Sequence, residues 1–347
     1  MSIYTLEDIE KIYLSYGLKA YETFGKQILD EVKNIDYTIT DKDYKKYEDH
    51  SNEQVVTIDG EHTRDIDDAI LVKKSGKFYS LTVYIADVSH YVKIGSKLDE
   101  EALMRGTSIY LPNKTLNMLP AKISNDICSL KESKKRLTLA VNMTFNNKGK
   151  LKSSRIFRAI ICSKKKMTYE KVFKVLQKSD ENVLNEYNEF IEQIHLMKDL
   201  AILLRKRRKK KGFLELYIPE YNFYIPSSLE FEHITILPYS TNIANSIIEE
   251  FMLITNMVVD KTFCKLGIPF IHRIHPAPSL DNIDFLNDKD YFKLFNKNDS
   301  YVIKYLTKKL KRCDENTKIL YSYNIMRNLC SAKYSDIPYG HFALNFK

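Results

Sequence analysis

The sequence predicts an α+β fold in which a mainly antiparallel sheet is covered by helices. Strand-like runs separated by turn residues occupy residues 54–92 and 137–162 of the 347-residue chain. Helical patterns dominate the later part, as in residues 185–212 and 245–259. The length suits one large domain or two small ones, and 44% hydrophobic residues provide a sizeable core.

The first 50 residues are expected to form a helical lead-in that ends in a charged linker. Leu6 and Ile9 begin a helical spacing of apolar residues, and a second short helical pattern follows. Residues 41–52 are charged and nearly free of aliphatic side chains, which indicates a surface linker. We therefore place the main domain at residues 51–347.

The next segments are predicted to be strands. Val55–Ile58 is an apolar, β-branched run, and Ala69–Val72 begins a second one. Turn residues at Lys73–Lys77 lead into a returning strand, Phe78–Ala86. A second pair is expected at residues 137–145 and 151–162, joined by an Asn- and Gly-containing hairpin turn.

The second half of the chain is predicted to be mostly helical. Residues 185–212 form a helix with a very basic end, Arg205–Lys211, and Gly212 stops it. The basic end either contacts phosphates or is a solvated helix end whose charge suits the helix dipole. Short strands are expected in residues 213–240, and further helices follow in residues 279–330.

An acidic loop lies between the first two predicted strands. Asp59, Asp65, Asp67 and Asp68 fall within ten positions. In an extended chain Asp65 and Asp67 share a side and Asp68 points away, so a regular strand cannot aim all four at one point. A loop anchored by strands at both ends can do so.

Crowded carboxylates repel one another, by roughly 1 kcal/mol for a pair 4 Å apart in water and more where water is excluded. Carboxylates held against buried strands therefore need a cation, or some must be protonated. Oxygen ligands without nearby His or Cys favour Mg²⁺ or Mn²⁺. A solvated acidic turn is one alternative. A calcium loop is another, although its alternating ligands, central glycine and closing glutamate are missing.

Charge and cysteine usage narrow the class of protein. The 54 Lys and Arg residues against 45 Asp and Glu give a net charge of +9, which suits RNA or a membrane surface. No apolar run approaches the roughly 18 residues of a membrane span, and the N-terminus lacks the pattern of a signal peptide. The five cysteines are scattered and never paired as CxxC. We expect free thiols in the cytoplasm, no membrane partner and no zinc site.

Several blocks of the sequence resemble the catalytic (RNB) domain of the ribonuclease II and ribonuclease R family of 3′→5′ exoribonucleases. The first comprises Thr57–Glu61 and Arg64–Ala69, which include all four aspartates. Further blocks with this resemblance include Ile85–Val92, Arg105–Pro112, Ser124–Leu130, Pro269–Pro276 and Gly340–Leu344.

The resemblance implies a curved sheet with helices packed around an RNA channel. It implies hydrolysis of single-stranded RNA from the 3′ end, releasing nucleoside 5′-monophosphates, with Mg²⁺ or alternatively Mn²⁺ as cofactor. By position in the motif, Asp59, Asp65 and Asp68 are the expected metal ligands. Asp67 and Asp65 are the expected catalytic residues, and Asp67 either binds the metal or positions water.

Three further residues are expected to contact RNA: Tyr110, Glu250 and Arg105. The family's tyrosine at the position of Tyr110 packs against a base near the 3′ end, and a core aromatic is the alternative. Glu250 faces the channel in this interpretation, whereas a structural salt bridge is its alternative. Asp87 and His90 either support the site or order their own loop.

The resemblance covers only part of the family pattern. The chain stops at Lys347, before a Ser-Pro-Ile-Arg-type motif whose arginine grips the scissile phosphate, and neither cold-shock nor S1 domains are present. We expect a domain that is incomplete at its C-terminal edge, with weak or no activity by itself. The alternatives to an active enzyme are an impaired RNA-binding fragment and one half of a split enzyme completed by a second polypeptide.

Overall fold

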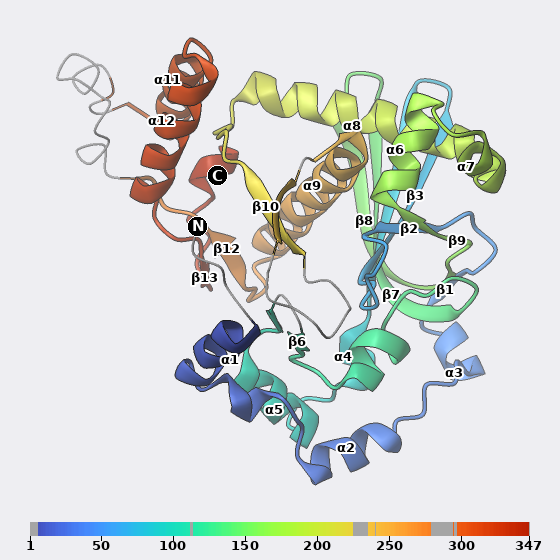
Figure 1. Ribbon diagram of the computed structural model, residues 1–347. Coiled ribbons are helices and arrows are strands. Elements are labelled where there is room, and N and C mark those ends of the chain that lie inside the picture. Colours follow the sequence, from blue (N-terminus) through green and yellow to red (C-terminus); the bar gives the residue numbers. More distant parts are fainter. Residues whose placement is uncertain are drawn as a thin grey trace.

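The computed structural model describes residues 6–111, 114–224, 235–239, 241–278, 294 and 297–346. It confirms the α+β class. A curled seven-stranded sheet has the order β1-β8-β7-β4-β3-β2-β9, and its inner pairings are antiparallel while the two outermost ones are parallel. The long helices α8 and α9 lie against the sheet, and α11 and α12 stand apart from it near the C-terminus (Figure 1).

Seven strands make the sheet, and all except the first and the last along the chain follow predicted apolar runs. They are β1 Glu48–His50, β2 Val56–Asp59, β3 Asp68–Ser75, β4 Phe78–Ala86, β7 Lys135–Asn146, β8 Leu151–Cys162 and β9 Lys165–Thr168. Three two-stranded ladders accompany the sheet: β5 Ile109–Tyr110 with β6 Thr115–Leu116, β10 Glu220–Tyr224 with β11 Thr235–Tyr239, and β12 His272–Ile274 with β13 Lys333–Ser335.

The helices match the expected distribution along the chain. They are α1 Leu6–Ser15, α2 Lys26–Lys33, α3 Asp41–Tyr44, α4 Val88–Tyr91, α5 Lys97–Arg105, α6 Tyr169–Gln177, α7 Glu181–Glu186, α8 Ile191–Lys211, α9 Ile243–Leu266, α11 Asp299–Leu310 and α12 Glu315–Asn328. Short 3₁₀ turns occur at Leu18–Tyr21, Asn188–Phe190 and Phe342–Leu344, and a π turn at Ile123–Ile127. The helical expectation for residues 279–293 lies outside the described residues.

Both faces of the sheet are buried. Successive residues of β3 alternate, so Ile70 and Val72 join one core while Ala69 and Leu71 join the other. The first core includes residues of α6, α8 and α9, and the second includes residues of α2, α5 and the turn at Ile123–Ile127. Burial on both faces explains why the central strands read as nearly continuous apolar runs.

The β7–β8 hairpin shows how the sheet and α8 are fitted together. Gly149 at its turn has a φ of 66°, and a Cβ there would lie 3.1 Å from the main-chain oxygen of Leu203 in α8. A larger residue at this position would therefore be strained in its backbone and would push against the helix.

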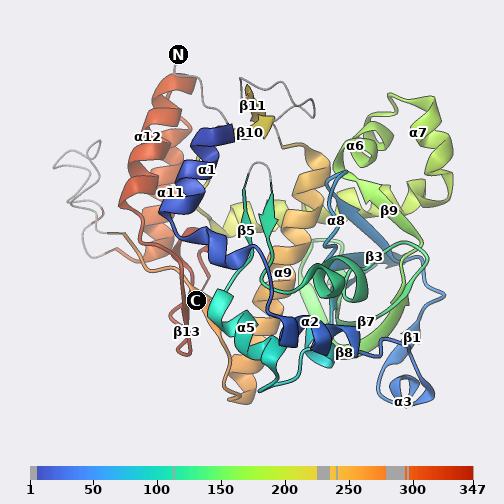
Figure 2. The ribbon, with the colours of Figure 1, turned by 60° about the horizontal axis from the view of Figure 1, so that its bottom comes forward.

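Two strands of the seven-stranded sheet, β1 and β9, were not predicted. β1 lies inside the charged stretch that was predicted to be a surface linker, and it pairs in parallel with β8. Beside it, Tyr47 is buried and donates a hydrogen bond to Asp87 over 2.7 Å. The lead-in also packs on the domain, because the main-chain N–H of Leu98 in α5 donates to Glu31 of α2. Figure 2 shows α2 and α5 side by side.

Candidate active site

The acidic loop emerges at one end of the sheet. Asp59 is the last residue of β2 and Asp68 is the first of β3. The two strands pair only at Val56 and Ile70, so they diverge before the loop begins. The loop residues between the strands therefore lack a ladder and need other partners for their main-chain groups.

Residues of the predicted Ser124–Leu130 block supply many of these partners. Ile66 is 2% exposed, and its main-chain N–H donates to the Ser129 hydroxyl over 3.2 Å. The same hydroxyl donates to the carbonyl of Arg64 over 2.7 Å, and the N–H of Leu130 donates to the carbonyl of Ile66 over 2.9 Å. We call Ser129 and Leu130 the clamp, because together they fix the loop from outside.

A lysine of β9 holds the other side of the loop. The Lys166 ammonium donates to the carbonyls of Glu61 and Thr63 over 3.1 and 2.8 Å. Its charge also lowers the pKa of Asp59, although burial outweighs it. A cavity of about 440 Å³ lies beside the loop, and Arg64, Lys131 and Lys166 are among the residues that line it. Sequence reasoning missed these cations, which were ordinary members of charged runs.

The environment of the aspartates opposes ionisation. Burial and then the charge of Asp68 raise the pKa of Asp59 to about 7. Burial and then the charge of Asp67 raise the pKa of Asp68 to about 6. Asp67 reaches solvent, and partial burial followed by the charge of Asp65 still raises its pKa. The Oδ2 atoms of Asp59 and Asp68 are buried without a hydrogen-bond partner.

These features fit a hard divalent cation. A buried carboxylate oxygen without a partner is costly, and a cation that accepts oxygen ligands removes the cost. The four carboxylates do not converge on a single point, since no three of them bring oxygens within 4.8 Å of one another. Mutual repulsion favours this spread.

Tyr110 lies at the acidic loop. It stands on β5, and its hydroxyl donates to Asp65 over 3.0 Å. The residue is 68% exposed, so the alternative of a core aromatic does not describe it.

Arg105 lies elsewhere and is engaged by the protein. Its side chain is 2% exposed and pairs with Glu101 over 2.7 Å. The guanidinium also donates to the carbonyls of Tyr21 and Thr23, each over 2.8 Å, and lies 3.8 Å from the ring centre of Phe24. The structure therefore gives no support to the predicted RNA contact, because the group that would bind phosphate ties the lead-in to α5.

Glu250 and Asp87 also have protein partners. Glu250 is 3% exposed on α9 and accepts hydrogen bonds from Arg208 of α8, which matches the salt-bridge alternative. Asp87 accepts hydrogen bonds from Tyr47 and Ser89, each over 2.7 Å. The side chains of Glu250 and Asp87 make no hydrogen bond or ion pair with the four aspartates of the acidic loop in the described part of the chain.

Comparison with known proteins identifies the family. The profile of the RNB domain matches residues 47–347. The chain belongs to the RNB domain family. Two similar relatives of this RNB domain are ribonuclease R of Thermotoga maritima, 35% identical over 97% of the chain, and ribonuclease R 2 of Lactococcus lactis, 33% identical over 94% of it. The chain spans about half the length of these relatives, 48% and 50%.

Solved structures share the fold of this RNB domain. Mycoplasma genitalium RNase R in complex with ribose-methylated single-stranded RNA is 27% identical with a TM-score of 0.84, over 98% of this chain and 53% of that one. Yeast Ssd1, described as a pseudonuclease, is 17% identical with a TM-score of 0.66, over 89% of this chain and 38% of that one. The second likeness concerns the fold alone.

Proposed function

We propose that the chain hydrolyses single-stranded RNA from its 3′ end and releases nucleoside 5′-monophosphates. The observation that carries the proposal is the acidic loop, in which Asp59 and Asp68 present buried, unpartnered oxygens at the ends of adjacent strands. Membership of the RNB family and the RNA-bound relative from Mycoplasma genitalium support the choice of substrate.

The aspartates divide into two groups by accessibility. Asp59, Asp65 and Asp68 would hold the cation after their side chains rotate toward it, since no three carboxylates of the loop bring oxygens within 4.8 Å of one another. Mg²⁺ is preferred to softer metals because all donors are oxygens. When bound, it would lower the pKa of water and neutralise charge that develops on the phosphate. Asp67 is open to solvent, and its carbonyl accepts a hydrogen bond from the N–H of Ala86 over 3.0 Å, which fixes its backbone. We assign Asp67 the task of orienting the attacking water.

Tyr110 would position the substrate. Its hydroxyl is tied to Asp65, so the exposed ring stands next to the proposed metal ligands. An aromatic face stacks on any base, which suits an enzyme that must accept every sequence. Arg64, which lines the neighbouring cavity, would supply positive charge for the phosphates, whereas Lys131 is paired with Asp126 over 3.1 Å and Lys166 holds the loop.

A catalytically impaired RNA-binding protein is the second candidate. The fold also occurs in Ssd1, a pseudonuclease, so the fold by itself does not decide activity. The spread of the four carboxylates favours this candidate, whereas the retention of all four in a clamped loop favours the enzyme. The comparisons give no support to a second polypeptide, and we do not propose one.

We also infer a reducing compartment such as the cytoplasm. All five cysteines are free, and two of them, Cys264 and Cys330, are exposed. In the described part of the chain, no helix is both long and apolar enough to span a bilayer.

The direction of digestion tests the proposal. A 5′-labelled single-stranded RNA would be incubated with the chain and Mg²⁺, beside Asp67→Asn and the control Asp199→Asn, which changes an exposed carboxylate of α8. We expect a ladder that shortens from the 3′ end with the wild type and the control only. RNA that is bound but stays intact with all three proteins would support the second candidate.

A further inference from the structure

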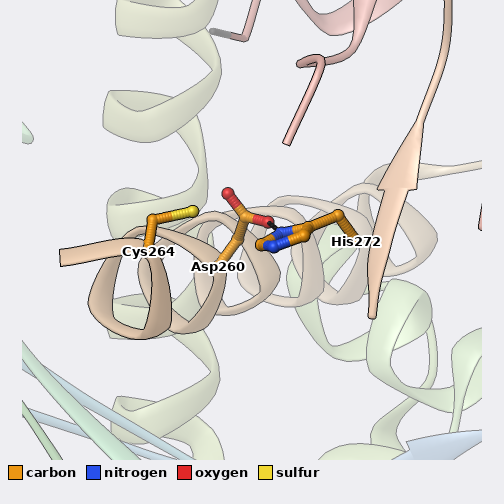
Figure 3. Close-up of side chains that lie close together, drawn as sticks. All are labelled: Asp260, Cys264 and His272. Atoms are coloured by element: carbon orange, nitrogen blue, oxygen red, sulfur yellow. Dashed lines mark hydrogen bonds and ion pairs between the residues drawn. The ribbon is translucent and has the colours of Figure 1, made fainter. Parts of the chain in front are cut away.

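A second cluster of ligand-type side chains lies where α9 ends. Asp260 and Cys264 are four residues apart on this helix and share a face. The helix ends at Leu266 and Gly267 follows with a φ of 63°, so the chain turns back and β12 brings His272 to the same place. Figure 3 shows the three side chains pointing toward one another.

The three donor atoms are close enough to share an ion. The ligand atoms of Asp260, Cys264 and His272 all lie within 4.8 Å of one another. Nδ1 of His272 and Oδ1 of Asp260 are 2.5 Å apart, a hydrogen-bonded pair. His272 is 5% exposed, whereas Cys264 is open to solvent, so an ion could enter from the cysteine side.

We propose that Asp260, Cys264 and His272 form a site for one zinc-class divalent ion, with a fourth position open to solvent or to an external ligand. Zinc accepts sulfur at about 2.3 Å and nitrogen or carboxylate oxygen at about 2.0–2.2 Å in a tetrahedral arrangement. In that arrangement the donors lie roughly 3.3–3.7 Å from one another. Small rearrangements of the side chains reach these separations, and the ion replaces the hydrogen bond between Asp260 and His272.

The donor atoms of the trio favour a soft or borderline ion over Mg²⁺. A cavity of about 430 Å³ adjoins it, and Lys261, Lys265 and Arg273 are among its lining residues. Lys261 lies 5.0 Å from the ring centre of Phe346, so part of this positive charge rests on an aromatic face. The positive charge repels all divalent ions alike, so binding depends on the thiolate and imidazole donors, which zinc and cobalt prefer and Mg²⁺ does not.

The consequence of binding is structural. The ion would join α9, which packs on the sheet, to the β12–β13 ladder near the C-terminus. It would therefore stabilise the contact between these two parts without touching the acidic loop. This inference is independent of the proposed nuclease activity.

Cobalt titration tests the site directly. Metal-free protein would be titrated with Co²⁺ in a large excess of Mg²⁺, which occupies oxygen-only sites, and thiolate-to-cobalt charge-transfer absorption would be recorded. We expect this absorption to saturate at one Co²⁺ per chain in the wild type and in Cys330→Ser, the control for the other exposed cysteine. Cys264→Ser should lose the absorption, and Asp260→Asn should weaken it. Equal absorption in Cys264→Ser and the wild type would overturn the proposal.

Alkylation of cysteines in the wild-type protein tests the same site without relying on variants that must fold. The rate of alkylation of Cys264 and Cys330 would be followed by peptide mapping, with and without Zn²⁺. We expect Zn²⁺ to slow the alkylation of Cys264 at least tenfold and to leave Cys330 unchanged. Unchanged alkylation of Cys264 at saturating Zn²⁺, or equal protection of both thiols, would contradict the site.

Discussion

The acidic loop and the α9–β12 trio are both clusters of ligand-type side chains, but they are built in opposite ways. The loop gathers oxygen donors from one short stretch, and the clamp and Lys166 fix its backbone. The trio gathers oxygen and sulfur donors from helix α9 and a nitrogen donor from strand β12, so regular secondary structure holds its backbone. The donors thus specify different ions, a hard one at the loop and a softer one at the trio.

The two regions also respond to acid in opposite directions. Asp59 and Asp68 have raised pKa values, about 7 and 6, so their carboxylates weaken the fold at neutral pH and cease to do so as pH falls. In residues 333–346, which contain the β13 partner of β12, burial and then the charge of His275 lower the pKa of His341 to about 4. The neutral imidazole of His341 contributes to the free energy of unfolding above pH 6.5, and this contribution is lost as pH falls toward 4.

The largest expected effect comes from metal removal. Chelation with EDTA should lower RNA hydrolysis by at least about 10³-fold, because the proposed chemistry depends on charge neutralisation at the loop. Mg²⁺ in excess of the chelator should restore the rate, and Cys264→Ser should respond in the same way as the wild type. RNA hydrolysis that continues after chelation would show that the acidic loop does not need a metal for catalysis, and would contradict the difference proposed between the loop and the trio.

Removal of the Ser129 hydroxyl from the clamp should have the second largest effect. Ser129→Ala leaves the N–H of Ile66 and the carbonyl of Arg64 without their partner, which costs about 1–3 kcal/mol of unfolding free energy. Hydrolysis should fall with it, since the loop loses its fixed position. Urea denaturation and initial rates measure both effects, and Ser153→Ala at an exposed position of β8 is the matched control. Equal stability and rate in both variants would show that the clamp is dispensable.

Tyr110 separates stacking from hydrogen bonding. Tyr110→Ala removes the ring and should weaken RNA binding by about 1–3 kcal/mol, the usual worth of one base stacked on an aromatic side chain. Tyr110→Phe keeps the ring and loses only the bond to Asp65, so its affinity should stay within about threefold of the wild type. Fluorescence anisotropy with labelled RNA gives both values. If Tyr110→Phe binds RNA as poorly as Tyr110→Ala does, the aromatic ring does not stack on a base.

The smallest expected effect is the opposite response to pH. Between pH 7 and pH 4, hydrogen-exchange protection in metal-free protein should rise in residues 59–68 and fall in residues 333–346, after correction for intrinsic rates. His341→Gln should flatten only the second change. Parallel changes in both segments would show that the two regions do not titrate separately.

Elements whose interacting residues are close in sequence were predicted correctly, and those that depend on distant residues were not. β4 and β8 have the predicted bounds because each follows a local turn and an apolar pattern. The aspartates share one loop because they are neighbours in sequence, although their carboxylates do not converge on a single point. β1 and β9 were missed because both are short, charged edge strands that pair with distant strands.

Long-range contacts decided what the sequence could not show. Arg105 has partners more than 80 positions away, which no local pattern reveals. The scattered cysteines gave no zinc signal, yet the turn after α9 brings His272 beside Cys264. Lys166 follows two other lysines in the sequence, and only the pairing of β9 with β2 places it at the acidic loop.

We propose that the acidic loop performs chemistry and does not merely bind RNA. Release of nucleoside 5′-monophosphate and RNA affinity should be measured in the same samples for the wild type, Asp67→Asn and Asp199→Asn, with Mg²⁺ present. We predict that Asp67→Asn binds RNA within about threefold of the wild type but releases product at least about 10³-fold more slowly. Equal release by the wild type and Asp67→Asn, or RNA binding by the wild type without release, would contradict the account.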